Sequence, residues 1–343
     1  MKSWPIFSIR SNGSNARLGK FFLLLILLTV LAALASICFG PVFVSPIQVP
    51  QILLGQVTGT VEADIVLLAR LPRTAGCLLA GMALAVSGAV IQSVLHNPLA
   101  APNIIGVNSG AGLLVVLVGA LAPKALWLTP LAAFFGALLG VLVVLFIAER
   151  TGASRITLVL AGVAVSNIFS AGIDAVVTFF PDAVLGYSDF RIGGLTNLSF
   201  DRLTPAFWVI LVAMAILFSL TSELDILALG SDTARSLGLP VKQLRLVFLA
   251  LAAALAGAAV SFSGLLGFVG LIVPHIMRRC IGEDSRPLLL SCALGGAALL
   301  TFCDLAARML FAPFELPVGI VLSLAGGPFF IWLLLRQRGG RIA

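Results

Sequence analysis

The sequence carries little charge and little of the chemistry that soluble enzymes use. Only 10% of its residues are charged, it has two histidines, and 60% of it is hydrophobic. Soluble domains have about 25% charged and about 45 to 50% apolar residues, so this chain cannot surround a folded core with a hydrated surface. The composition therefore excludes a water-soluble globular protein and predicts that lipid is the main solvent.

Motifs that would supply catalysis or metal binding are also missing. The five cysteines make no CxxC pair and mostly fall inside apolar runs, so neither a disulfide framework nor a metal site is predicted. No GxxxxGK(S/T) phosphate loop occurs, which excludes that route to ATP hydrolysis by this chain. A membrane enzyme would need His, Asp or Glu clustered at one membrane face. We therefore predict that the chain is not an enzyme, has no catalytic residue and binds no cofactor.

Long apolar runs are what the sequence has in abundance. A helix needs about 20 apolar residues to cross a bilayer, and the runs are continuous instead of alternating, which favours helices over barrel strands. We predict an all-α integral membrane protein with about ten transmembrane helices. The predicted spans are residues 21–39, 74–95, 108–121, 127–148, 156–180, 204–220, 244–262, 266–281, 287–310 and 317–335.

The net charge of +7 fits a membrane topology. Basic residues are scattered in short loops without an aromatic-studded patch, so no nucleic-acid partner is predicted. A cytoplasmic N-terminus places most Lys and Arg residues inside, in agreement with the positive-inside rule, and puts both termini in the cytoplasm. The predicted parts are a basic cytoplasmic tail at 1–20, a transmembrane domain at 21–336 and a cytoplasmic tail at 337–343.

The order of the predicted helices suggests an internal repeat. Helices two to five form a four-helix block that starts outside, and helices seven to ten form one that starts inside, as in an inverted repeat. The sequences of the two blocks have little in common, so the topology alone carries this prediction. The spacings from Gly106 to Gly110 and from Gly136 to Gly140 predict close helix packing.

The inside loop between helices six and seven predicts two short helices at about 225–240. Gly230 can end the first helix, Ser231 or Asp232 can cap the second, and Gly238 with Pro240 can end it. Such a helical pair would make a rigid projection for a soluble partner. The other interpretation is an amphipathic pair that packs on its own bundle.

Polar residues near the helix ends leave two interpretations open. Asn97 and Pro98 end helix two in a polar turn, which is either a tight inside loop or part of a gate. Asp174, Asp304 and His275 also lie near helix ends, where each is either hydrated or caps a neighbour. An ion-coupled carrier would bury a relay of such groups at mid-membrane, and none is evident.

Several motifs in order along the chain carry a resemblance to a known family. They are Arg70-Leu-Pro-Arg73, Gly81 through Ser87-Gly88 and Gln92 to Asn97-Pro98-Leu99-Ala100, Gly106-Val-Asn-Ser-Gly110, Leu158 to Gly162, Leu227-Ala-Leu-Gly230 with Ala234, Leu237 and Gly238, Gly267-Phe-Val-Gly270 through Pro274-His275, Asp304 with Arg308, and Glu315-Leu-Pro317. Through them the chain resembles the permease subunits of bacterial ABC importers for iron siderophores, haem and cobalamin, the type II ABC importers. The resemblance covers nearly the whole chain after residue 20 and implies the type II permease fold in the inner membrane.

The resemblance also implies partners and a docking site. It implies two cytoplasmic ATPase subunits that use ATP and Mg, a periplasmic or lipid-anchored substrate-binding protein, and a second permease that is either a copy or a paralogue. Arg70, Arg73 and Arg308 match positions that meet acidic residues of the binding protein, and all three are predicted on the outside, against the charge rule. The other interpretation of Arg308 is an i,i+4 pair with Asp304 on one helix.

Two further sets of residues take their roles from the resemblance. The helical pair at 225–240 would couple the permease to the ATPase through Leu227, Leu229, Gly230, Ala234, Leu237 and Gly238. The transport pathway or its gate would include Asn97, Pro98, Ser154, Asn167 and Asp174.

The resemblance gives an iron(III)-siderophore complex as the first substrate, with haem or cobalamin as alternatives that the sequence does not separate. A hypothesis from another class is an ion-coupled secondary transporter, against which the missing acidic relay and the predicted helical projection count.

Overall fold

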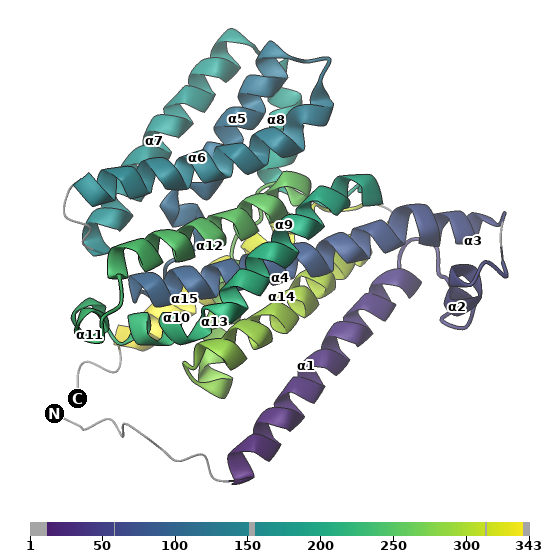
Figure 1. Cartoon of the computed structure of the whole chain (residues 1–343). Helices are drawn as coiled ribbons and strands as arrows, with labels where there is room; N and C mark the ends of the chain where they lie inside the picture. Colours follow the sequence, from purple (N-terminus) through teal and green to yellow (C-terminus); the bar gives the residue numbers. More distant parts are fainter. Residues whose placement is uncertain (1–11, 58, 151–154, 313, 339–343) are drawn as a thin grey trace.

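The computed structural model describes residues 12–57, 59–150, 155–312 and 314–338 (Figure 1). Within these ranges the chain forms helices joined by short connections and contains no β-strand. The main helices are α1 (Asn12–Cys38), α4 (Leu71–Leu95), α5 (Val107–Leu121), α6 (Thr129–Arg150), α7 (Arg155–Phe179), α9 (Phe200–Ser219), α12 (Val241–Ser263), α13 (Val269–Ile281), α14 (Ser285–Met309) and α15 (Val318–Arg338). The predicted all-α membrane class is confirmed.

The predicted number of ten spans is approximate. Among the described residues, seven helical segments are long and apolar enough to cross a membrane, and one of them runs from Val61 to Leu95. Helix α5 has 15 residues and α13 has 13. At 1.5 Å per residue these two helices cross only part of a bilayer about 30 Å thick, whereas the 21 residues of α15 are long enough to cross it.

Several short helices join the main ones. They are α2 (Gln48–Leu53), α3 (Val61–Asp64), the π-helix η1 (Ile65–Arg70), the 3-10 helices η2 (Pro102–Ile105) and η3 (Leu126–Leu128), α8 (Ala183–Ile192), α10 (Thr221–Ala228) and α11 (Ser231–Ser236). Of these, α10 and α11 were predicted, because glycine and proline mark their ends. Helix α1 begins at Asn12, so part of the predicted tail 1–20 is helical.

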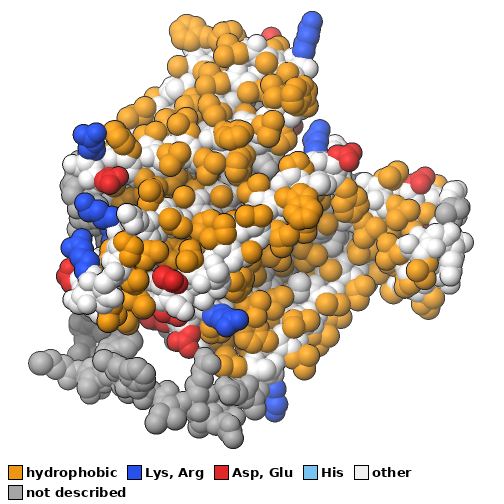
Figure 2. All heavy atoms as spheres, viewed as in Figure 1, with side chains coloured by type: hydrophobic (Ala, Val, Ile, Leu, Met, Phe, Trp, Pro, Cys, Tyr) orange, Lys and Arg blue, Asp and Glu red, His pale blue; other side chains and the backbone are white. Residues whose placement is uncertain are grey.

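Helix α4 lies at the centre of the bundle and packs against α12, α13 and α14 (Figure 1). Most of its side chains are buried, which explains why it is apolar on all sides. Helices α5, α6, α7 and α8 form a second group beside this bundle, joined to it mainly through α6 and α12. In Figure 2, hydrophobic side chains cover most of the visible face, as lipid contact requires.

Glycines allow the closest helix contacts. A Cβ atom at Gly110 would lie 2.1 Å from the carbonyl oxygen of Gly136, and one at Gly140 would lie 2.1 Å from that of Gly106. Helices α5 and α6 therefore touch backbone to backbone, which confirms the close packing predicted from the two glycine spacings. Gly88 of α4 and Gly270 of α13 make a contact of the same kind.

The bundle has two distinct ends. One end, called here the α10–α11 end, holds these two helices, the C-termini of α4, α6 and α13, and the N-termini of α12 and α14. The opposite end, called here the α2–α3 end, holds α2, α3 and the C-termini of α1 and α14. Charged side chains gather at the α10–α11 end in Figure 2.

Candidate functional site

An ionic cluster lies at the α2–α3 end, where α4 begins and α14 finishes. The Arg73 guanidinium bridges two carboxylates: Nε donates to Asp304 Oδ2 at 3.0 Å, Nη2 donates to Asp304 Oδ1 at 3.0 Å, and Nη1 donates to Glu315 Oε2 at 2.6 Å. Asp304 is fully buried, whereas the Glu315 side chain is 34% exposed. Arg73 therefore joins α4 to α14 and to the connection between α14 and α15.

Two more arginines extend the cluster toward α1. Arg308 Nε lies 3.2 Å from Asp304 Oδ2, within ion-pair distance but without a well-directed hydrogen bond, and its Nη2 donates to Ser36 Oγ at 2.8 Å. Arg70 donates to the carbonyl oxygens of Ile37 at 2.7 Å, Cys38 at 3.0 Å and Val42. Ile37 and Cys38 are the last residues of α1 and Val42 follows it, so Arg70 holds the end of α1 and the start of the connection to α2.

All three arginines are buried in this chain. Arg70, Arg73 and Arg308 were predicted at the outer side of the membrane as docking groups, and their exposed fractions are 5%, 9% and 3%. The i,i+4 pair of Arg308 with Asp304 is confirmed. A buried guanidinium needs carboxylates or carbonyls as hydrogen-bond partners. The partners here come from neighbouring helices and connections, which cover the three arginines. Their role in docking stays a prediction, and it does not rest on free guanidinium groups.

A polar groove of about 440 Å³ opens between α5, α7 and α8. It is lined by Asn103, Asn108, Ser109, Ser166, Ser170, Ile173, Asp174, Tyr187, Arg191 and Leu265. Ser109 Oγ donates to Ser166 Oγ at 3.2 Å, which ties α5 to α7 at the groove. Burial raises the pKa of the Tyr187 phenol, with Arg191 opposing and Asp174 adding to the shift. The groove thus offers amides, hydroxyls and one charge of each sign to a solute.

The residues predicted for the pathway do not all meet in this groove. Asp174 lines it, whereas Asn167 is exposed on α7 outside the lining. Asn97 Oδ1 accepts a hydrogen bond from the Leu99 amide at 3.0 Å, which closes the polar turn after α4, and Pro98 beside it is exposed. Ser154 lies outside the described residues. The structure supports the tight turn at Asn97, and a gating role there stays a prediction.

Helices α10 and α11 confirm the predicted helical pair. Leu227 and Ala234 are fully buried against the bundle, whereas Leu229 and Leu237 are 68% and 61% exposed. The turns after the two helices have positive φ, at Gly230 (120°) and Gly238 (82°), where L side chains are strained.

Capping within this pair differs from the prediction. The N-cap of α11 is Gly230, and no side chain caps the helix. Ser231 instead accepts a hydrogen bond from Arg245 Nη2 at 3.1 Å, which ties α11 to α12. Asp225 Oδ1 accepts a bond from the Ser285 amide at 2.7 Å and ties α10 to the start of α14. The pair is therefore fixed to two long helices.

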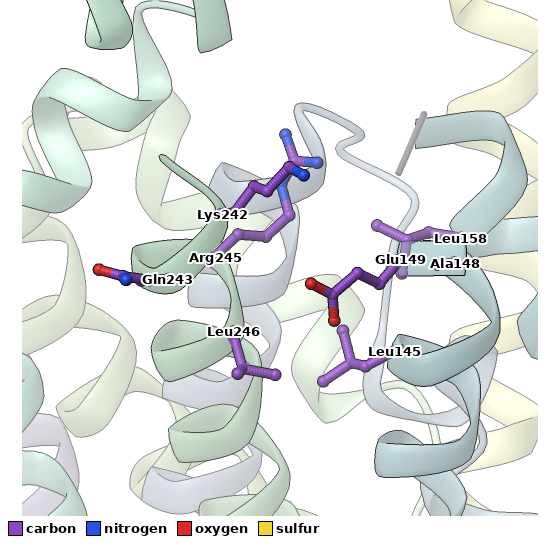
Figure 3. Close-up of a pocket in the computed structure, with 8 residues that line it drawn as sticks. All are labelled: Leu145, Ala148, Glu149, Leu158, Lys242, Gln243, Arg245 and Leu246. Atoms are coloured by element: carbon purple, nitrogen blue, oxygen red, sulfur yellow. The ribbon is translucent and has the colours of Figure 1, made fainter. Parts of the chain in front are cut away.

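A small cavity of about 110 Å³ lies between α6, α7 and α12 at this same end (Figure 3). Glu149 faces Arg245 and Leu246 of α12 across the cavity, while Gln243 points away from it. Arg245 of α12 also donates a hydrogen bond to Ser231 of α11. A movement of α12 relative to α6 would therefore also move α11.

Some residues at these sites gave no signal in the sequence. Ser36 lies far in sequence from Arg308, which it contacts, and neither Ser36 nor Tyr187 belongs to a motif. Arg191 lies on α8, a helix that was not predicted. Glu315 was part of a motif without an assigned role.

Comparisons with known proteins all match this chain to transport permeases. A sequence profile of the FecCD transport family matches residues 26–336. The chain is 41% identical over 280 residues to the hemin transport system permease protein HmuU of Yersinia pestis, covering 79% of this chain and 83% of that protein. It is 37% identical to the vitamin B12 import system permease protein BtuC of Escherichia coli, over 93% of this chain and 96% of BtuC.

Two further comparisons extend this result. The Fe(3+)-citrate import system permease protein YfmE of Bacillus subtilis is 34% identical to this chain, over 91% of this chain and 93% of YfmE. Among solved structures, an inward-facing conformation of a metal-chelate type ABC transporter aligns with a TM-score of 0.79 and 30% identity, covering 93% of this chain and 99% of that chain.

Proposed function

The chain belongs to the FecCD transport family and is a permease subunit of an ABC importer, and from this premise we propose that it carries an iron(III)-siderophore complex across the bacterial inner membrane. It is a multi-pass transport subunit, and ATP is hydrolysed on a separate ATPase subunit. The importer therefore includes ATPase partners and a substrate-binding protein.

The polar groove is the observation that supports a ferric chelate. Amide and hydroxyl groups dominate its lining, with Asp174 and Arg191 adding opposite charges. Such groups exchange hydrogen bonds with the oxygen-rich surface of a chelate, whereas a flat apolar macrocycle would be better served by aromatic and aliphatic walls. The similarity to the Fe(3+)-citrate permease supports iron, and the similarity to the hemin and vitamin B12 permeases keeps haem and cobalamin as alternatives.

The pathway proposal joins the groove to a second permease. A second copy or a paralogue packed over this groove would close it into a channel. Asp174 would line this channel, and Asn97, Pro98, Ser154 and Asn167 would lie along it or at its gate. The pathway can pass a bulky complex without binding it strongly, because selectivity can be left to the binding protein.

The two ends of the bundle would receive different partners. We place the substrate-binding protein at the α2–α3 end, over Arg70, Arg73 and Arg308, and the ATPase subunits, which use ATP and Mg, at the α10–α11 end. The gathering of charged residues at the latter end supports a cytoplasmic location for it and for both termini. The exposed leucines of the helical pair support contact with a soluble protein there.

Uptake measurements test the proposed substrate. Cells with and without this gene would be given radiolabelled ferric siderophores, haem and cobalamin, with a strain carrying a mutated nucleotide-binding lysine in the ATPase as the control. We expect ferric siderophore uptake to be lost in both defective strains. If only haem or only cobalamin uptake is lost, that compound is the substrate and the siderophore proposal is wrong. Uptake that persists without ATPase activity would contradict ATP-driven import.

A double substitution tests the helical pair. Leu229→Glu with Leu237→Glu should lower assembly with the ATPase more than about tenfold, since each replaces an exposed apolar contact with a charge at a protein interface. Copurification of ATPase with the permease from membranes would measure this. Gln243→Glu adds a charge at the same end outside the pair and should leave assembly unchanged. Normal assembly of the double variant would exclude these leucines from the interface.

A further inference from the structure

Glu315 occupies an unusual place in the ionic cluster. Its carboxylate takes one nitrogen of Arg73 at 2.6 Å, while Asp304 takes the other two. Asp304 is fully buried and held from α14, whereas Glu315 lies in the connection between α14 and α15 with about a third of its side chain exposed. Of the two carboxylates on Arg73, only that of Glu315 can leave toward the solvent without breaking a helix.

The charges of the cluster leave room for another acid. Arg70, Arg73 and Arg308 bring three positive charges, and Asp304 and Glu315 bring two negative ones. Arg70 is satisfied by backbone carbonyls instead of a carboxylate. A buried cluster with one surplus positive charge favours the approach of an anionic side chain.

The surface around Glu315 also suits a protein partner. Leu310, Phe311 and Phe314 of the same connection are all exposed, and they place apolar area beside the carboxylate. The Leu316 amide donates to the Ala307 carbonyl at 3.2 Å, which holds the connection on one side of Glu315. Protein–protein interfaces combine apolar area with a few specific polar contacts, and the surface around Glu315 has both.

We propose that Glu315 is an internal substitute for the partner's carboxylate: it holds Arg73 while the permease is free and gives up that place to an acidic side chain of the docking substrate-binding protein. This inference rests on the proposed function and explains how a buried arginine can serve docking. Arg73 keeps two carboxylates before and after the exchange, so the buried charge is never left unpaired. Docking then competes with an internal ligand, which weakens the complex and keeps it reversible.

Glu315→Gln tests the exchange. The amide keeps the size of the side chain but loses the charge, so the internal bond to Arg73 weakens while an incoming carboxylate bonds as before. We expect the dissociation constant of the binding protein for the complete permease–ATPase complex in nanodiscs to fall about tenfold. The probe is the binding protein that supports uptake in the transport assay above. Glu62→Gln removes an exposed acid of α3 at the same end and should leave the dissociation constant unchanged.

Two further variants separate this mechanism from general electrostatics. Glu315→Asp keeps the charge on a shorter side chain and should give an affinity between those of the wild type and Glu315→Gln. In an Arg73→Gln background the Glu315→Gln change should have no effect on affinity, because no guanidinium remains to be exchanged. An equal gain from Glu62→Gln, or a gain from Glu315→Gln that persists without Arg73, would show that only overall negative charge matters and would overturn the proposal.

The outcomes also separate this inference from the proposed function. If the wild-type complex does not bind the protein that supports uptake, the proposed function, which makes that protein its partner, is wrong. If the wild type binds and Glu315→Gln binds equally or more weakly, the docking site stands and the exchange is wrong. Elution of each variant as a single peak in size-exclusion chromatography confirms that the fold is intact.

Discussion

Asp304→Ala is expected to lower the free energy of unfolding by about 3 to 5 kcal/mol, the range for removing one partner of a buried ion pair. Asp304 is fully buried and lies between Arg73 and Arg308, which are themselves buried. Without it, Arg73 keeps only Glu315 and Arg308 keeps only Ser36. Two guanidinium groups would then be left in a site that excludes water.

Heating the purified protein in detergent and measuring the fraction that stays monodisperse would show this loss as a lower midpoint temperature. Asp182→Ala removes an exposed carboxylate that makes no capping hydrogen bond at the start of α8 and should leave the midpoint unchanged. An unchanged midpoint for Asp304→Ala would mean that these ion pairs do not contribute to stability.

Arg73→Glu would place another carboxylate against Asp304 and destabilise the fold. A charge reversal at Arg73 therefore cannot report on docking alone.

Gly88→Ala is expected to destabilise the bundle by about 3 kcal/mol or more, at or above the upper end for overpacking a core. The new Cβ atom would lie 1.9 Å from the carbonyl oxygen of Gly270, and this obstacle is backbone that cannot rotate away. Helices α4 and α13 would have to separate, and α4 is the helix around which the bundle is built. Hydrogen bonds from Arg278 of α13 to Ala89 and Ser93 of α4 would stretch with them.

The same thermal assay measures the effect of this methyl group. Gly327→Ala is the matched control, because it adds a methyl group within α15 at a site with no atom inside 4 Å of the new Cβ. We expect Gly327→Ala to keep or slightly raise the midpoint, since alanine favours a helix over glycine. Equal midpoints for Gly88→Ala and the wild type would show that the two helices have room between them.

The arginine cluster shows where sequence reasoning about the site ended. The positive-inside rule identified Arg70, Arg73 and Arg308 as exceptions, and the resemblance gave them a docking role. The spacing of Asp304 and Arg308 predicted their contact because four residues on one helix fix the distance. The contacts of Arg73 with Asp304 and Glu315 span most of the chain, and no local rule encodes such a distance.

Local features of the sequence were enough to predict the solvent, the helical class, the approximate spans and the pair α10–α11, because apolar length, glycine turns and proline stops act over a few residues. The glycine spacings at 106–110 and 136–140 also predicted close helix packing, without saying which helices meet. No local pattern predicts that the outside arginines are buried, that Glu315 holds Arg73, or that α7 and α8 meet α5 around a polar groove. These features depend on which helices become neighbours, and that choice is made by the packing of the whole bundle.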